Sequence, residues 1–266
     1  MIKLEIKDRV AFIVMQNKEH YNTLSEVMCN EMSDALDEAY KAECVAIVIK
    51  AECSLNVWSA GHDNRELPID GNDPLAYDVP MERLLRKVQD TPIPVIACVS
   101  GTVWGGACDL CVSCDMIVAS GQATFAITPA KIGIPYNASG IMHFINQLGI
   151  NKAREMFFTA NAISAQDALN VGFVNAIARV EELDGMLESR FLTPLRRNSV
   201  LSMSAIKRQF RILSRATSTI SSESFEKINE YRRRVYQGDD YKEGIQSFLE
   251  KRPPEYKGKA SDIDKA

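Results

Sequence analysis

A strand, a glycine-rich turn and a helix follow one another directly near the middle of this sequence. The five apolar residues 95–99 predict a buried strand, and the turn after them contains Gly101, Gly105 and Gly106. Small residues with helical character occupy positions 107–114. The fold must therefore bring the end of a strand close to the beginning of a helix, with a short glycine-rich turn between them.

The beginning of this helix exposes backbone N–H groups, because the first turn of a helix has no internal acceptors for them. Those donors and the positive end of the helix dipole favour negative charge. Two interpretations are open. The amide of Gly106 can stabilise an oxyanion, or the glycines only permit tight packing of helix and strand. A short glycine-rich turn does not decide between them.

A second loop of small residues follows another apolar strand upstream. Residues 45–49 (VAIVI) predict this strand, and residues 57–63 (VWSAGHD) form the loop after it. The chain thus contains two loops with accessible backbone, each placed after a buried strand.

Together, the loops WSAGHD and GTVWGGACD resemble those of the crotonase (enoyl-CoA hydratase/isomerase) superfamily, and the resemblance covers nearly the whole chain. Within it, the segments ELP, DPLAYDVP, TPAKIGIPYN and FLEKRPP are similar to the methylmalonyl-CoA decarboxylase branch. The resemblance implies an α/β fold with a crotonase-type ββα spiral core. We expect that acyl-CoA-binding core over residues 1–190 and a C-terminal helical oligomerisation region over residues 191–266.

The resemblance also implies the catalytic residues. His62 and Gly106 would each donate one backbone N–H to the thioester oxygen of an acyl-CoA. Tyr136 would point into the pocket near the substrate carboxylate, although a core aromatic is an equal interpretation from the sequence alone. Asp109 would protonate the enolate or orient the loop, and the imidazole of His62 would touch the carboxylate or the CoA.

Residues from three segments are implied to bind CoA. Lys18 would meet the CoA phosphates, and Phe248 with Lys251 would meet the adenine and a phosphate. A surface lysine and ordinary helix packing are the alternatives for these positions. The predicted CoA-binding residues are Lys18, Ser59, Ala60, Gly61, Phe248 and Lys251.

The composition excludes several classes of protein. The 266 residues are 46% hydrophobic and 25% charged, which is ordinary for a globular chain of one large or two small domains. A net charge of −4 argues against nucleic acid as a partner. No stretch reaches membrane-spanning length, so we expect no membrane partner and a cytoplasmic protein.

The cysteines predict a reduced, buried set. There are 7, an odd number, mostly within apolar runs. Cys108, Cys111 and Cys114 have a spacing seen in iron–sulfur ligands, but Asp115 follows where such a motif would continue. The same spacing puts the three thiols on one helix face. We therefore expect a buried helix face, no metal, and no cofactor apart from the CoA carried by the substrate.

Periodicity predicts the remaining elements. A hairpin is expected around residues 7–9, and a helix over residues 24–39 with Ser25 or Thr23 as its cap. Two helices are expected at residues 141–149 and 152–159, and three more at residues 200–213, 221–236 and 240–251.

The acids near the glycines indicate the reaction. Hydratases resemble one another in two glutamates, whose positions are occupied here by Asp109 and Ala130. Loss of one general acid or base costs roughly 100- to 10,000-fold in rate, which makes efficient hydration unfavourable. Decarboxylation needs only a held enolate and an oriented carboxylate, and an apolar Ala130 in the pocket suits it.

We therefore predict a decarboxylase that converts (methyl)malonyl-CoA-type thioesters to propionyl-CoA or acetyl-CoA. The alternatives are an enoyl-CoA hydratase or isomerase that uses Asp109, and a non-catalytic acyl-CoA-binding protein. The acyl group could also be carried on a carrier protein. Family habit suggests a homotrimer or a dimer of trimers.

Overall fold

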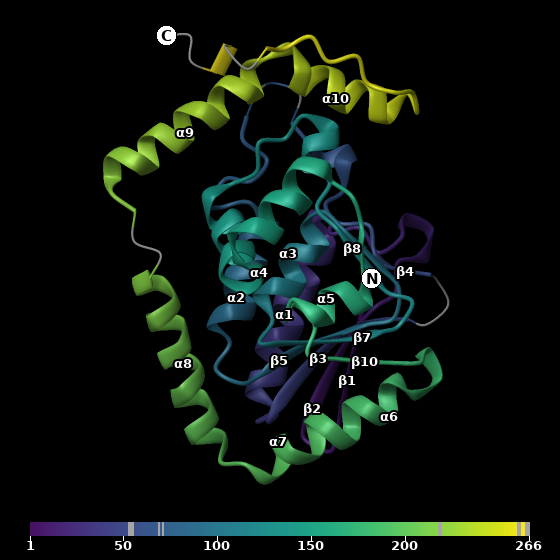
Figure 1. Ribbon diagram of the computed structural model, residues 1–266. Helices are drawn as coiled ribbons and strands as arrows, with labels where there is room; N and C mark the ends of the chain where they lie inside the picture. Colours follow the sequence, from purple (N-terminus) through teal and green to yellow (C-terminus); the bar gives the residue numbers. More distant parts are fainter. Residues whose placement is uncertain (53–55, 69, 71, 218–219, 260–261, 264–266) are drawn as a thin grey trace.

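The computed structural model describes residues 1–52, 56–68, 70, 72–217, 220–259 and 262–263, and within these ranges its strands form two β-sheets (Figure 1). The larger sheet has the order β1-β2-β3-β5-β7-β10, and the smaller has the order β4-β6-β8-β9. The strands are β1 (Ile2–Lys7), β2 (Val10–Met15), β3 (Ala46–Ala51), β4 (Val57–Ser59), β5 (Val95–Val99), β6 (Thr102–Trp104), β7 (Met116–Ser120), β8 (Thr124–Ala126), β9 (Ile163–Ser164) and β10 (Ala176–Ala178).

The core of the fold is a repeated strand–strand–helix unit. Each of β3, β5 and β7 is followed by a short strand of the smaller sheet and then by a helix: α2 (Pro80–Asp90), α3 (Gly106–Ser113) and α4 (Ala138–Thr159). Neighbouring strands of successive units pair in parallel within both sheets. Every residue of β5 is buried, as expected for a parallel strand covered on both faces. The predicted ββα spiral of the crotonase type is confirmed.

Local sequence signals explain the elements outside the spiral. The hairpin between β1 and β2 turns at Asp8 and Arg9, which have φ values of 48° and 62°. Helix α1 (Glu26–Lys41) begins after Ser25, whose hydroxyl accepts a hydrogen bond from the Met28 amide. The two helices expected on either side of position 149 are confirmed: both lie within α4, which non-helical geometry at Gly149 (φ 72°, ψ 158°) divides into two helical parts.

The C-terminal part of the chain is helical. After α5 (Ala165–Asn170) come α6 (Leu183–Leu187), α7 (Thr193–Arg197), α8 (Val200–Thr217), α9 (Ser222–Gln237) and α10 (Asp239–Leu249). In Figure 1, α8 runs along one side of the core, while α9 and α10 pass over one end. The large side chains of Leu201, Phe210 and Leu213 on α8 are exposed. The oligomeric state and the division at residue 190 stay predictions.

Helices α9 and α10 hold the loops between β4 and α2. The Tyr241 hydroxyl donates a hydrogen bond to the Pro68 carbonyl at 2.8 Å, and the Arg232 guanidinium pairs with Asp73 at 2.7 Å. These contacts hold Pro68 beside Leu67 and Asp73 close to Leu75. Among the described residues, none of the helices combines the length and apolarity that crossing a bilayer requires.

A buried lysine attaches helix α8 to the spiral. Lys207 is only 9% exposed, and its Nζ lies 2.6 Å from Asp115 Oδ2. The ammonium also donates to the carbonyls of Val88 and Ile93, at 3.3 and 3.1 Å. The same Asp115 oxygen accepts the Val95 amide, so this ion pair links α8, α2 and the start of β5.

Replacing Lys207 with methionine should lower the free energy of unfolding by about 2 kcal/mol, because it removes the buried ammonium that donates to Asp115 and to the carbonyls of Val88 and Ile93. Urea unfolding would measure this loss. The double variant Lys207→Met/Asp115→Asn should recover at least half of it. As a matched control, Lys87→Met removes the exposed pair with Asp37 and should cost under about 1 kcal/mol. Equal losses in the two single variants would contradict the anchoring role.

Candidate active site

The two loops predicted from the sequence meet at the ends of neighbouring strands β4 and β6. Gly61 has φ +85°, and a Cβ at this position would lie 2.3 Å from the Trp104 carbonyl oxygen and 3.1 Å from the Gly106 nitrogen. Only glycine fits such an approach. A Cβ on Gly106 would in turn lie 3.5 Å from the His62 nitrogen. The backbone amides of His62 and Gly106 are therefore neighbours.

The Gly106 amide has no acceptor within its own helix, since Gly106 is the first residue of α3. Gly105 before it has φ 53° and donates its N–H to the Ala126 carbonyl at 2.8 Å. That bond fixes the turn and leaves the Gly106 N–H at the helix terminus, where the dipole favours negative charge.

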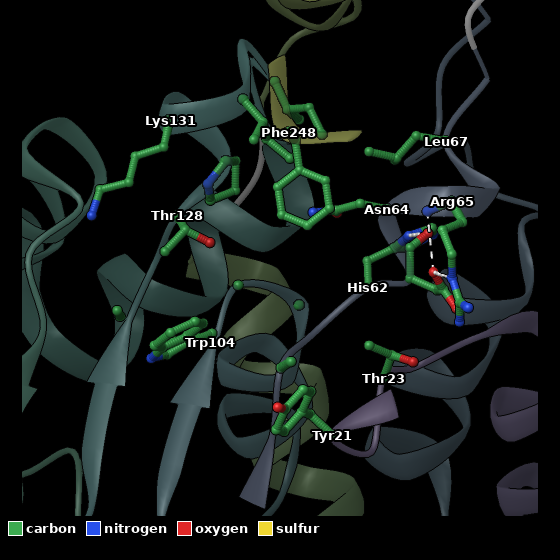
Figure 2. Close-up of a pocket in the computed structure, with 18 of the residues that line it drawn as sticks. Tyr21, Thr23, His62, Asn64, Arg65, Leu67, Trp104, Thr128, Lys131 and Phe248 are labelled. Carbon is green, nitrogen blue, oxygen red and sulfur yellow. Dashed lines mark hydrogen bonds and ion pairs between the residues drawn. The ribbon is translucent and has the colours of Figure 1, made fainter. Parts of the chain in front are cut away.

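A cavity of about 820 Å³ opens beside these two amides. Its wall is largely apolar, with side chains from the loops, the smaller sheet and the 3₁₀ helix Pro129–Ile132. Figure 2 shows Phe248 of α10 over the cavity, with Thr128 and Lys131 on one side and His62 and Arg65 on the other. The apolar lining residues include Leu67, Leu75, Met81, Trp104, Ile132 and Ile134.

Most of the predicted site residues lie at this cavity. His62, Gly106 and Tyr136 line it, as do Ala60, Phe248 and Lys251. Phe248 and Lys251 reach it from the same chain. The roles of these residues stay predictions, but the structure brings together segments that are far apart in the sequence.

Two predicted CoA-binding residues have other contacts. The Ser59 side chain is fully buried, and its hydroxyl donates to the Asn22 carbonyl at 2.6 Å and accepts the Gly61 amide at 3.2 Å. These two hydrogen bonds fix the backbone of the loop. Lys18 pairs with Glu52 at 3.2 Å and is not part of the cavity lining.

The His62 imidazole is held beside the loop. Its Nδ1 lies 3.1 Å from the Asp63 carbonyl oxygen. Burial lowers the pKa of His62, which favours the neutral ring. Arg65 hydrogen-bonds Asp63 through Nε at 2.8 Å and holds the pKa of that carboxyl below its usual range. The imidazole is thus neutral beside an ion pair.

Asp109 lies behind the cavity wall. It is 1% exposed, and its Oδ2 accepts the Tyr136 hydroxyl at 2.8 Å while its Oδ1 lies 2.9 Å from His143 Nδ1. Burial, and then Asp109, raises the pKa of Tyr136 well above its ordinary value. A Cβ on Gly140 would lie 2.3 Å from Tyr136 Cε1 and 2.8 Å from Asp109 Oδ2, so only glycine lets these side chains meet.

A second buried acid lies near Asp109. Glu82 of α2 is 5% exposed, and its Oε1 accepts a hydrogen bond from Asn137 Nδ2 at 2.7 Å. Burial, and then the Asp109 carboxylate, raises the pKa of Glu82 from 4.5 to about 7. Glu82 and His143 were missed from the sequence, because an acid in the first turn of a helix and a lone histidine are ordinary surface features.

Two other expectations concern this region. The thiols of Cys108 and Cys114 donate to backbone carbonyls at 3.3 Å, and the six cysteines that the structure describes are buried and form no disulfide among themselves. Cys53 lies outside the described residues. The expectation that Ala130 forms an apolar pocket wall is wrong: Ala130 is exposed, while Pro129 and Lys131 beside it line the cavity.

Comparison with known proteins places this site in a family. Residues 5–259 match the enoyl-CoA hydratase/isomerase family model. The chain belongs to the enoyl-CoA hydratase/isomerase family. It is 39% identical over 251 residues to a methylmalonyl-CoA decarboxylase from Escherichia coli (strain K12), covering 94% of this chain and 95% of that one.

Two further relatives show the range of this family. A solved methylmalonyl-CoA decarboxylase in complex with 2-nitronate-propionyl-CoA superposes with a TM-score of 0.94 at 38% identity, covering 97% of this chain and 98% of that one. A trans-2-decenoyl-(acyl-carrier-protein) isomerase from Streptococcus mutans is 28% identical, covering 97% and 98% of the two chains. The prediction of a crotonase-superfamily enzyme resembling a methylmalonyl-CoA decarboxylase is confirmed.

Glu82 should make the stability of this family member depend on pH. The pKa of Glu82 is higher in the folded protein than in the unfolded chain. The stabilisation that the neutral Glu82 carboxyl contributes is therefore complete below about pH 4.5 and is lost as the pH rises through about 7. Glu82→Gln does not titrate and keeps an acceptor for Asn137. Relative to wild type, this variant should gain about 2 kcal/mol between pH 5 and pH 8 in urea unfolding. Glu155→Gln, on an exposed ion pair, is the control.

The prediction concerns the pH dependence and not the absolute stability of the variant. A difference between Glu82→Gln and wild type that is the same at pH 5 and pH 8 would contradict the raised pKa. The control should show no comparable gain on raising the pH.

Proposed function

We propose that this enzyme decarboxylates malonyl-type thioesters, with methylmalonyl-CoA or malonyl-CoA giving propionyl-CoA or acetyl-CoA. One observation carries the proposal. Asp109 and Glu82 lie behind the cavity wall, and Tyr136 lies between Asp109 and the cavity. Among the described residues, the carboxylates that line the cavity are Glu19 and Asp63, and Asp63 is held by Arg65.

Hydration of an enoyl thioester requires acids or bases that face the substrate and activate water. With Asp109 covered by Tyr136, a water molecule in the cavity meets a phenol and not a carboxylate. Decarboxylation has no such requirement, since the electrons of the breaking C–CO₂ bond pass into the thioester carbonyl. This wall therefore favours decarboxylation over hydration or isomerisation.

The neighbouring amides of His62 and Gly106 are proposed to hold the thioester oxygen. Donors fixed by the fold stabilise the enolate oxygen without having to reorganise when charge develops. The apolar wall lowers solvation of the substrate carboxylate, which favours its loss as neutral carbon dioxide. The wall at this point is formed by Tyr136, which carries no charge. A carboxylate in the same place would repel the carboxylate of the substrate.

The CoA part is proposed to extend toward Phe248 and Lys251. The cavity also contains Arg65 and Lys131, which the sequence did not suggest and which supply positive charge suited to phosphates. Ala60 and Gly61 belong to the same loop as His62. The proposed reaction needs no resident metal or redox cofactor, because the electrons remain within the substrate. A carrier-bound acyl group would meet the same wall.

The test is to supply methylmalonyl-CoA and, separately, crotonyl-CoA and to identify products by mass spectrometry. The expected result is propionyl-CoA from the first and no 3-hydroxyacyl product from the second. Hydration of crotonyl-CoA alone would replace the proposal with a hydratase. Tight binding of both esters without any product would indicate a non-catalytic acyl-CoA-binding protein.

A pair of variants at Gly106 tests the proposed oxyanion donors. Gly106→Pro removes the amide hydrogen, and proline is tolerated at the first position of a helix. Gly106→Ala adds the same Cβ, which meets the flexible Met81 side chain at 2.8 Å, but keeps the N–H. The proline variant should lose roughly 100- to 1,000-fold in kcat beyond the alanine variant. Equal kcat values would contradict donation by this amide.

A further inference from the structure

The proposed decarboxylation uses one proton in each turnover. Loss of carbon dioxide leaves an enolate, which becomes a thioester only when its α-carbon takes a proton. A CoA ester bound in the cavity, as proposed above, would restrict the entry of water at that moment. The protein must then supply the proton from within the wall.

We propose that this proton reaches the substrate through a chain of three side chains, Tyr136, Asp109 and His143, that connects the cavity with solvent behind it. This inference rests on the proposed function. Tyr136 lines the cavity and donates the proton to the enolate carbon. His143 acts through Asp109 and is a positioning and relay residue that does not touch the substrate.

The geometry makes the chain continuous. Tyr136 Oη lies 2.8 Å from Asp109 Oδ2, and Asp109 Oδ1 lies 2.9 Å from His143 Nδ1. Both oxygens of one carboxylate are thus used, one toward the cavity and one away from it. Exposure increases along the way, from 1% for Asp109 to 21% for the His143 side chain. His143 is therefore the member of the chain that can exchange protons with water.

Gln89 can form a hydrogen bond with His143 in either protonation state of the imidazole. Its Nε2 lies 3.0 Å from His143 Nε2 and 3.1 Å from the Ser113 hydroxyl. Its Oε1 is buried and, among the described residues, has no hydrogen-bond partner. A neutral His143 accepts the amide N–H, while an imidazolium needs an acceptor at Nε2. A half-turn of the Gln89 amide supplies that acceptor, so both states can be satisfied.

The groups around Asp109 limit the charge of the chain. Glu82 faces it from α2, with Arg86 on the same helix and Asn137 bound to the Glu82 carboxyl. Burial raises the pKa of Glu82, which keeps this acid neutral in mildly acidic solution. A neutral Glu82 does not place a second ionised carboxylate beside Asp109.

The proton balance closes over one turnover. The Tyr136 O–H bond breaks as the C–H bond of the product forms, which leaves a phenolate. The His143 imidazolium gives its proton to the Asp109 carboxylate, and the carboxylic acid formed in this way gives a proton to the Tyr136 phenolate. Asp109 is then a carboxylate again, and His143 takes a proton from water. Carbon dioxide leaves, one solvent proton is consumed, and no oxidant or reductant is needed.

The chain can be tested by asking what happens to the enolate when protonation is slow. His143→Gln keeps a hydrogen-bond donor for Asp109 but cannot carry the proton. Its kcat for propionyl-CoA should fall about tenfold, with KM within about twofold of wild type. The longer-lived enolate should recapture ¹³CO₂ from added bicarbonate. Incorporation of ¹³C into remaining methylmalonyl-CoA, relative to product formed, should then rise by about tenfold.

Three further measurements complete the test. Tyr136→Phe keeps the ring packed against Phe157 and should raise the same exchange ratio, so the test stands even if the His143 variant folds poorly. Imidazole added to His143→Gly should restore part of kcat and lower the ratio. Lys152→Gln, on an exposed ion pair of the same helix, should leave both quantities unchanged.

The outcomes separate the two proposals. A wild-type enzyme that releases no carbon dioxide from methylmalonyl-CoA overturns the proposed function and the chain with it. Decarboxylation by wild type, with exchange ratios in both His143→Gln and Tyr136→Phe equal to that of wild type, overturns the chain alone. Lower kcat with an unchanged ratio would assign these side chains a structural role only.

Discussion

The contact between the loop at Gly61 and the carbonyl of Trp104 is the constraint on which the site depends. A Cβ at Gly61 would lie 2.3 Å from that oxygen, so the two loops can approach only without a side chain there. The approach results from the parallel pairing of β4 and β6, which end at the same edge of the smaller sheet. The strand order and the glycine at position 61 together make neighbours of two amides from distant parts of the chain.

The same spiral that makes these amides neighbours also buries charge beside them. Helices α2, α3 and α4 follow successive strand pairs, and each contributes one titratable side chain: Glu82, Asp109 and His143. Burying such groups is unfavourable unless they are paired and hydrogen-bonded. Here Asp109 bonds to His143 and Tyr136, and Glu82 bonds to Asn137. The polar groups are satisfied by one another, which leaves the cavity wall itself largely apolar.

The sequence predicts the strands and loops of the site much better than the polar and charged side chains that are buried beside them. Apolar runs and glycines reveal the strands and the two loops, because those signals are local. Glu82 and Gln89 are seven residues apart and lie on one face of α2, but in the sequence they look like the solvent face of an amphipathic helix. The groups that make this face an interior surface come from α3 and α4, since Gln89 contacts Ser113 and His143 and Glu82 binds Asn137 at the start of α4. No local pattern in the sequence reveals these contacts.

The positions of Lys18, Ser59 and Ala130 outside the cavity lining have a related cause. Position in a loop identifies which residues are near a cavity, but the direction of each side chain depends on contacts made elsewhere. The Ser59 hydroxyl is used by Asn22 beneath the loop, and the 3₁₀ turn at Pro129–Ile132 exposes Ala130 while Lys131 lines the cavity. A motif therefore specifies the backbone donors of this fold with more certainty than the side chains around them.

The contrast between fixed backbone amides and variable side chains explains how one fold can catalyse several reactions. Backbone amides remain in place whatever the side chains are, so the proposed stabilisation of an enolate depends on the spiral and not on particular side chains. The choice of reaction then depends on whether an acid faces the substrate or lies behind another group. In this chain the Tyr136 hydroxyl stands between Asp109 and the cavity, at 2.8 Å from the carboxylate. One side chain on the turn before α4, Tyr136, therefore keeps the buried acid Asp109 out of the cavity. In the proposed reaction, Tyr136 donates a proton to the substrate, while Asp109 does not reach a water molecule in the cavity.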